Sequence, residues 1–210
     1  MYSERRVTAF EWASRLHATQ VRKGSEAPYL SHLLGVASLV IEYGGDEDAV
    51  IAGLLHDVVE DCGGRAMLDE IGDEFGAVVA ATVAECSDNA LSDGEAKPPW
   101  EQRKRDYIAA VRFKSARACL VTACDKLHNA NAIIGDDRHA REGGGTPVWE
   151  RFSGKPREQT VACYTAISAA LQGLVPPALG ALLANTVAEL RDLADLSAHD
   201  IWVDRLLAAE

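Results

Sequence analysis

The amino-acid sequence predicts an all-α protein, on three observations. Apolar residues recur three or four positions apart along most of the 210 residues, as on one face of a helix. Clusters that contain glycine or proline divide the chain into segments of helical length. No stretch shows a convincing alternation of polar and apolar residues, as a half-buried β-strand would. With 48% hydrophobic residues, the chain suits one compact domain over residues 1–210.

Each expected helix ends at a loop or a break. In chain order, the expected helices cover residues 4–22, 31–44, 47–61, 66–75, 76–86, 100–113, 116–134, 156–173, 178–196 and 198–208. Gly24 and Pro28 mark the first loop, and Gly63-Gly64 break the chain after the third helix. Longer loops are expected over residues 87–99 and 135–147. A core of about residues 7–135 carries the motifs described below, and residues 147–210 add C-terminal helices.

The net charge, the cysteines and the apolar runs of the sequence indicate which classes of binding partner to expect. The formal net charge is -11, whereas a nucleic-acid-binding domain is usually basic, so DNA and RNA are not expected as partners. A local basic patch or a metal would still let an acidic protein bind a small anionic substrate. The five cysteines are odd in number and form no Cys-x-x-Cys pair, which indicates reduced thiols in a cytoplasmic protein. No signal peptide and no apolar run of roughly 20 residues is visible, so no membrane association is expected.

The segment 51–61 places polar chemistry on one face of a helix. At about 100° per residue, His56, Asp57, Glu60 and Asp61 lie opposite a stripe of valine, leucine and isoleucine. Small residues one turn earlier would let another helix approach, so the polar groups are expected to face a cleft. A His-Asp doublet with two more acids offers nitrogen and oxygen ligands to a divalent metal. The alternative is a solvated amphipathic face that happens to contain a histidine.

Two distant positions complete the expected metal site. His32 opens its helix just after a proline, and Asp125 shares a helical face with His128 and Asn129. His32, His56, Asp57 and Asp125 would supply two imidazoles and two carboxylates, and further ligands would be water or phosphate. Such a site suits Mn²⁺ or Fe²⁺ better than a closed tetrahedral zinc site. Taken singly, His32 could cap its helix and Asp125 could pair with Lys126.

These motifs resemble the metal signature of the HD phosphohydrolase superfamily. More narrowly, the chain resembles the (p)ppGpp hydrolase domain of RelA/SpoT-type enzymes and the small alarmone hydrolases. The matching stretches are Arg22-Lys23, Pro28–His32, Leu54–Asp61, Phe75-Gly76 and Asp125–Asn129. The resemblance implies an HD-domain helical bundle, one Mn²⁺ ion, and hydrolysis of the 3′-pyrophosphate of guanosine tetra- or pentaphosphate.

The same resemblance assigns roles to individual positions. It implies that His32, His56, Asp57 and Asp125 hold the metal and that Glu60 and Asp61 act on the attacking water. It implies that Arg22 and Lys23 lie beside the nucleobase and Asn129 near the ribose and phosphates. From its place in the motif, Lys126 is expected to neutralise phosphate.

Other interpretations stay open. Arg22 and Lys23 also suit the C-terminus of a helix, where its dipole favours cations. Lys126 also suits the protein surface, and the basic cluster Arg103–Arg105 suits an exposed helix face. The family often has an arginine where this chain has Asn131, which favours another nucleotide as the substrate. A catalytically weak metal-binding sensor is a third possibility, and the sequence gives no indication of the oligomeric state.

Overall fold

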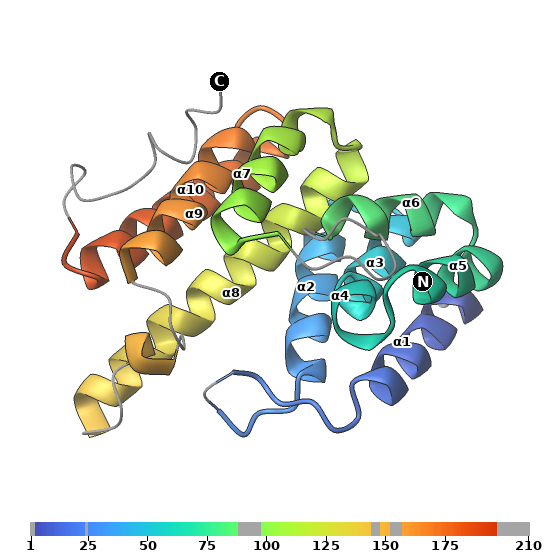
Figure 1. The fold of residues 1–210 in the computed structure, drawn as a ribbon, viewed down its shortest axis with the longest axis horizontal. Helices are drawn as coiled ribbons and strands as arrows, with labels where there is room; N and C mark the ends of the chain where they lie inside the picture. Colours follow the sequence, from blue (N-terminus) through green and yellow to red (C-terminus); the bar gives the residue numbers. More distant parts are fainter. Residues whose placement is uncertain (1–2, 24, 88–97, 144–147, 152–156, 197–210) are drawn as a thin grey trace.

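A computed structural model describes residues 3–23, 25–87, 98–143, 148–151 and 157–196 of the chain. Within these ranges the regular structure is helical, apart from one isolated antiparallel β-bridge between Val21 and Pro28. The expected all-α class is confirmed. The longest helix, α8, runs diagonally through the molecule, with α1–α6 on one side and α9 and α10 on the other (Figure 1). None of the described helices has an apolar stretch long enough to cross a bilayer.

The N-terminal helices form the larger part of the molecule. Their bounds are α1 Glu4–Leu16, α2 Leu30–Glu42, α3 Glu47–Leu55, α4 Val58–Cys62, α5 Gly64–Phe75 and α6 Ala77–Cys86. Asp46 caps α3 by accepting a hydrogen bond from Ala49 N at 3.0 Å, and Arg117 of α8 holds the same carboxylate. Gly76 separates α5 from α6 with φ of 91°, a left-handed conformation that favours glycine.

The remaining helices lie on and beyond α8. Their bounds are α7 Trp100–Ala110, the 3₁₀ turn η1 Val111–Phe113, α8 Ala116–Gly143, the 3₁₀ turn η2 Val148–Arg151, α9 Arg157–Ala170 and α10 Pro177–Leu193. The helix expected over residues 198–208 and most of the loop expected over residues 87–99 lie outside the described part of the chain.

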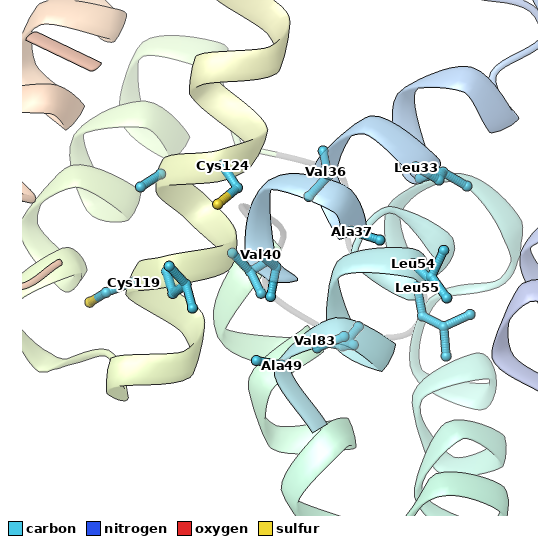
Figure 2. Packing of buried hydrophobic residues seen from close by; sticks show 14 of the residues in the cluster. Leu33, Val36, Ala37, Val40, Ala49, Leu54, Leu55, Val83, Cys119 and Cys124 are labelled. Carbon is cyan, nitrogen blue, oxygen red and sulfur yellow. The ribbon is translucent and has the colours of Figure 1, made fainter. Parts of the chain in front are cut away.

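One large apolar cluster holds the helices that carry the predicted site. Leu33, Val36 and Val40 of α2 pack with Leu54 of α3 and Cys124 of α8 (Figure 2). The stripe expected on residues 50–59 is buried, as predicted. At about 25 cal/mol per Å² of apolar surface, this burial is the main force that holds α2, α3 and α8 in register.

Three helix boundaries differ from the sequence expectation. The helix expected over residues 4–22 ends at Leu16. The helix expected over residues 47–61 is broken at His56-Asp57, which separate α3 from α4. The expected end of α8 near residue 134 is also wrong, because the helix continues to Gly143. A second apolar cluster buries Ile133 and Ile134 in this part of α8, and Ala140 is buried as well. This packing outweighs the low helix propensity of Gly135.

Residues 20–29 form a hairpin between α1 and α2. Arg22 N donates to Ala27 O at 2.8 Å, and Tyr29 N donates to Gln20 O at 2.9 Å. Arg22 and Lys23 therefore lie on a hairpin, so the helix-dipole interpretation of this pair is wrong. From the hairpin, the side chains reach three different segments: Gln20 contacts Asp61 of α4, Arg22 contacts Asn129 of α8, and Tyr29 contacts Asp57.

Candidate functional site

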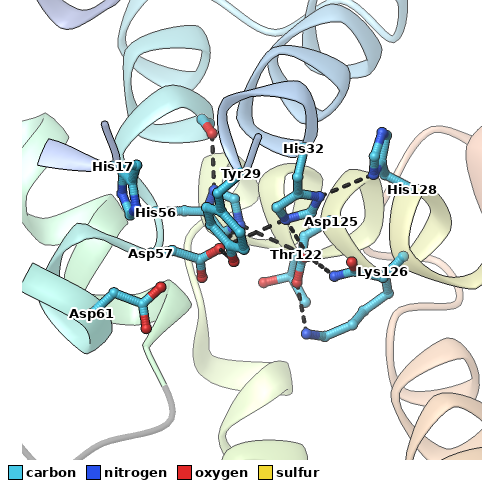
Figure 3. A network of polar contacts seen from close by, with 12 residues as sticks. His17, Tyr29, His32, His56, Asp57, Asp61, Thr122, Asp125, Lys126 and His128 are labelled. Carbon is cyan, nitrogen blue, oxygen red and sulfur yellow. Dashed lines mark hydrogen bonds and ion pairs between the residues drawn. The ribbon is translucent and has the colours of Figure 1, made fainter. Parts of the chain in front are cut away.

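Four predicted side chains converge where α2, α8 and the break between α3 and α4 meet (Figure 3). His56 Nε2 lies 3.1 Å from Asp57 Oδ2 and 3.8 Å from Asp125 Oδ1. His32 Nε2 lies 3.6 Å from Asp57 Oδ2 and 3.3 Å from Asp125 Oδ1. Both imidazole nitrogens thus face the same two carboxylates, although the four residues are up to 93 positions apart in the sequence (32 to 125).

This cluster has the properties of a divalent-metal site. His32 is 1% exposed and His56 is 4% exposed. In the described part of the chain, neither Nε2 atom has a directed hydrogen bond. A buried imidazole nitrogen without a partner is costly unless a ligand takes its lone pair. His32, His56 and Asp57 offer ligand atoms within 4.8 Å of one another, and Asp125 adds a further oxygen. The donor set of imidazoles and carboxylates fits a cation such as Mn²⁺ or Fe²⁺.

The other ring nitrogens orient the two histidines. His56 Nδ1 lies 2.9 Å from Gly53 O, a carbonyl that only accepts, so this nitrogen carries the hydrogen. His32 Nδ1 lies 3.0 Å from His128 Nδ1. When His32 donates in that contact, Nε2 of each ring is the atom left to bind a cation. Second contacts of this kind fix the tautomers of metal-binding histidines.

Charge within the cluster is strongly coupled. Burial disfavours a charged His56, but Asp57 and Asp125 outweigh it and raise the pKa of the imidazole well above its usual value. Burial likewise disfavours a charged Asp57, but the His56 charge lowers the pKa of that carboxyl to about 2. For Asp125, Lys126 outweighs burial and lowers the pKa. Both acids are thus carboxylates at neutral pH, and a bound cation would replace the proton on His56.

Tyr29 joins the cluster to a larger cavity. Its hydroxyl donates to Asp57 Oδ2 at 2.5 Å. Burial and the Asp57 charge raise the pKa of Tyr29, so the phenol stays protonated and keeps donating. Tyr29 also lines a cavity of about 260 Å³ with Arg22, Lys23, Asn129 and Tyr164. The aromatic ring is a shared wall between this cavity, named here the base-side cavity, and the metal cluster.

Hydrogen bonds link the base-side cavity to Asp125. Arg22 Nη2 donates to Asn129 Oδ1 at 3.0 Å, and Asn129 Nδ2 donates to Asp125 Oδ1 at 2.5 Å. In the described part of the chain, the second terminal nitrogen of Arg22, Nη1, is buried without a hydrogen-bond partner. A guanidinium held in this way can meet a planar or anionic group in the cavity.

The two predicted catalytic acids point to different places. Glu60 is partly buried and lines a small cavity of about 50 Å³ beside the cluster, with His56, Asp57 and Asp125. Asp61 is exposed, and its Oδ2 accepts a hydrogen bond from Gln20 Nε2 at 2.8 Å. Of the two carboxylates, only that of Glu60 lines the small cavity.

Two lysines line the same small cavity. Lys126 Nζ donates to Asp125 Oδ2 at 2.6 Å, and this contact keeps the ammonium charged despite its burial, with a raised pKa. Lys104 of α7 also lines this cavity. Arg103 instead lines a separate cavity bordered by α6, α7 and η1. The basic cluster that the sequence placed on an exposed face therefore contributes one cation, Lys104, to the predicted site.

Two site neighbours were not singled out by sequence reasoning. His128 was not among the expected site residues, but it contacts His32 and packs so closely on Gly35 that a Cβ there would lie 2.2 Å from the ring. The signal was present, because His128 follows Asp125 by three positions on the same helical face. Gln20 had no comparable signal, since its partner Asp61 is 41 positions away.

The sequence matches a known protein family over most of its length. Residues 9–155 match the HD domain family. Over 126 residues, the chain is 38% identical to a guanosine-3′,5′-bis(diphosphate) 3′-pyrophosphohydrolase of Homo sapiens, a match that covers 59% of this chain and 66% of the human protein. It is 34% identical over 127 residues to a probable GTP pyrophosphokinase of Mycobacterium leprae, which covers 60% of this chain and 15% of that protein.

The fold is similar to that of a solved relative. The structure of a metazoan ortholog of SpoT, described as hydrolysing ppGpp, superposes with a TM-score of 0.70 and 25% sequence identity. The superposition covers 94% of this chain and 99% of the other. On the family match, which spans most of the sequence, the chain belongs to the HD domain family.

Proposed function

We propose that this chain is a metal-dependent phosphohydrolase that removes the 3′-pyrophosphate of (p)ppGpp. The observation that carries the proposal is the pair of buried His32 and His56 Nε2 atoms that face Asp57 and Asp125 beside a cavity of about 260 Å³. The similarity to (p)ppGpp hydrolases of the HD type supports the choice of substrate.

His32, His56, Asp57 and Asp125 would hold the cation, which we propose to be Mn²⁺, with Fe²⁺ as the nearest alternative. When bound, such a cation supplies Lewis acidity toward a phosphoryl oxygen and lowers the pKa of water. Glu60 lines the same cavity and would orient a water molecule and accept its proton. Asp61 lies outside that lining and would support Glu60 through the position of α4.

Different residues would bind the phosphates and the nucleoside of the substrate. Lys126, which shares the small cavity with Glu60, would neutralise the pyrophosphate. Arg22 and Lys23 would meet the purine and Asn129 the ribose, because all three line the cavity on the far side of Tyr29. We place the purine nucleoside in this space of about 260 Å³ and the scissile phosphate at the metal cluster, with Tyr29 and Asn129 between them.

A second candidate is an HD hydrolase of another nucleotide. The sequence favoured it because Asn131 stands where the family often has arginine. Asn131 is exposed and does not belong to the lining of the base-side cavity, so this departure carries less weight than the sequence alone gave it. A catalytically weak sensor is less well supported, since Glu60 stands at the cluster with its carboxylate intact.

We also propose that residues 1–210 form one domain located in the cytoplasm. Tyr164 of α9 and Val148 of η2 line the base-side cavity together with Arg22, which supports a shared unit. All five cysteines are free thiols, which supports a reducing compartment.

One assay tests the proposed function. The purified chain with Mn²⁺ is given ppGpp, GTP, dNTPs and NADPH in separate reactions, and pyrophosphate and orthophosphate are measured separately. The expected result is pyrophosphate release from ppGpp, which stops after chelation and returns with Mn²⁺. A His56→Ala variant should be inactive. Turnover of another nucleotide with none of ppGpp would leave the broader phosphohydrolase function and remove the alarmone assignment.

A further inference from the structure

Asp61 lies at the end of a hydrogen-bonded chain that the proposed chemistry does not explain. Gln20 Nε2 donates to Asp61 Oδ2 at 2.8 Å, and Gln20 Oε1 lies 2.5 Å from His17 Nδ1. His17 Nε2 in turn lies 3.9 Å from Cys62 Sγ. Because Cys62 follows Asp61 directly, both ends of this series of side-chain contacts lie on α4.

The chemistry of Asp61 and Gln20 fixes the direction of two hydrogen bonds. An Asp61 carboxylate only accepts, so the amide nitrogen of Gln20 must face it and the amide oxygen must face His17. That oxygen only accepts, so His17 Nδ1 carries a hydrogen. Burial and the Asp61 charge raise the pKa of Cys62, so its thiol keeps its hydrogen, which it can donate to Leu16 O at 3.7 Å. The Gln20 contact alone therefore requires a hydrogen on Nδ1 of His17.

The scaffold that holds this chain is well buried and braced. His17 is 2% exposed and stacks on Tyr29, with ring centroids 5.2 Å apart and planes at 28°. Gln20 is fixed by its backbone, since Gln20 O accepts from Tyr29 N across the hairpin at 2.9 Å. By contrast, Asp61 is exposed and sits on α4, a helix of 5 residues that is too short to be rigid alone.

We propose that His17 and Gln20 are positioning residues that hold Asp61 and α4 in the orientation the hydrolysis requires. The inference rests on the proposed function, because it assigns Asp61 its role next to Glu60. Without this series of hydrogen bonds, an exposed aspartate would sample several rotamers, and the short helix that carries Glu60 would lose the hydrogen bond from Gln20 to Asp61. Misplacement of this kind lowers the rate of the chemical step more than it lowers binding of the substrate.

Matched substitutions separate the hydrogen bonds from the packing. Gln20→Met keeps the length of the side chain and removes both hydrogen bonds. His17→Phe keeps a ring that can stack on Tyr29 but has no donor. His17→Asn places an amide N–H near the position of Nδ1 but has no ring. We expect Gln20→Met and His17→Phe to lower kcat roughly tenfold with KM within about twofold. We expect His17→Asn to keep kcat within about threefold of the wild type, and all three to retain the metal.

A double-mutant cycle tests whether the effect passes through Asp61. Gln20→Met should cause no further loss of kcat in an Asp61→Asn background. If it lowers kcat by the same factor in that background as in the wild type, the two residues act independently and the proposal is wrong. A kcat of His17→Phe close to that of the wild type would also contradict it, since the stacked ring would then suffice without the hydrogen bond.

A spectroscopic readout does not depend on the substrate. In ¹⁵N-labelled protein, His17 should show the Nδ1–H tautomer with a slowly exchanging ring proton, and Gln20→Met should abolish this signal. A His17 that carries its hydrogen on Nε2 in the wild type would overturn the proposal. If the wild type fails to hydrolyse ppGpp while the Nδ1–H signal is present, the proposed function fails and the hydrogen-bonded chain stands.

Discussion

His128 Nδ1 lies 3.0 Å from His32 Nδ1, and the two rings are tilted with centroids 4.9 Å apart. Burial, with His32 and Arg22 nearby, lowers the pKa of His128 to about 4, so this ring is neutral at pH 7. A neutral His128 can accept the Nδ1 hydrogen of His32, which leaves His32 Nε2 free to bind a cation.

Removing that acceptor should weaken the metal site. In His128→Leu, the His32 ring loses its orientation, and we expect affinity for Mn²⁺ to fall about 10–100-fold. His128→Asn retains an acceptor oxygen and should lose less. Competition with a chromophoric chelator measures both affinities. Equal affinities in the wild type and His128→Leu would mean that His128 does not orient His32.

Glu60→Gln should separate metal binding from turnover. The carboxylate of Glu60 lines the cavity but is proposed as a base and not as a ligand. The variant should therefore keep one metal ion per chain and lose turnover by on the order of 10²-fold or more. Elemental analysis beside steady-state kinetics checks both. Loss of the metal would instead make Glu60 a ligand.

Arg22→Ala should affect binding of the substrate and spare the chemistry. The guanidinium lines the base-side cavity and contacts Asn129, away from the reacting phosphorus. We expect KM for ppGpp to rise roughly tenfold, about 1.4 kcal/mol, with little change in kcat. Metal content is the control, because Asn129 also contacts Asp125. A fall in metal content would show that Arg22 acts through this contact instead.

Lys114 should make stability depend on alkaline pH. Burial lowers its pKa from 10.5 to about 8, and its Nζ lies 3.5 Å from the centroid of the Tyr107 ring. Below pH 8 the folded state bears the full cost of the buried charge. Between pH 8 and 10.5 the unfolded chain holds a proton that the folded chain lacks, so this group makes the protein more stable as pH rises.

Lys114→Met should remove that cost. At pH 7 the variant should unfold at a higher temperature, by about 2–4 °C for a gain of about 1 kcal/mol. The advantage should shrink as pH approaches 10.5, where the wild-type amine is neutral in both states. Arg65→Met, which removes an exposed cation, serves as the control and should show no such trend. A stability difference independent of pH would contradict the assigned pKa.

Helical spacing was enough to predict which side chains meet at the site. His56 and Asp57 lie opposite a continuous apolar stripe, and Asp125 shares a face with Asn129, so burial of the stripes forces the polar faces together. Spacing could not predict the break between α3 and α4, because Leu55, His56 and Val58 are all compatible with a helix. A local contact of His56 with Gly53 O and a tertiary contact of Asp57 with Tyr29 accompany the break.

Long-range contacts explain the remaining differences. The paired acids Glu60 and Asp61 were expected to act together, but Gln20 draws Asp61 toward the hairpin while Glu60 faces the cluster. The end of α1 and the hairpin depend on pairing of Val21 with Pro28, which no local pattern near residue 17 announces. The continuation of α8 past Gly135 depends on its packing with α10, a helix that begins more than 40 positions later, at Pro177.

Part of the wall of the base-side cavity comes from segments that carry no metal-site residue. Tyr164 belongs to α9 and Val148 to η2, whereas the four residues of the cluster belong to α2, α8 and the α3–α4 break. Substitutions at Tyr164 or Val148 can reshape the nucleoside pocket and leave the distances among His32, His56, Asp57 and Asp125 as they are. Over evolutionary time, a lineage with this architecture can exchange one nucleotide for another by small steps, each of which keeps a working hydrolytic centre.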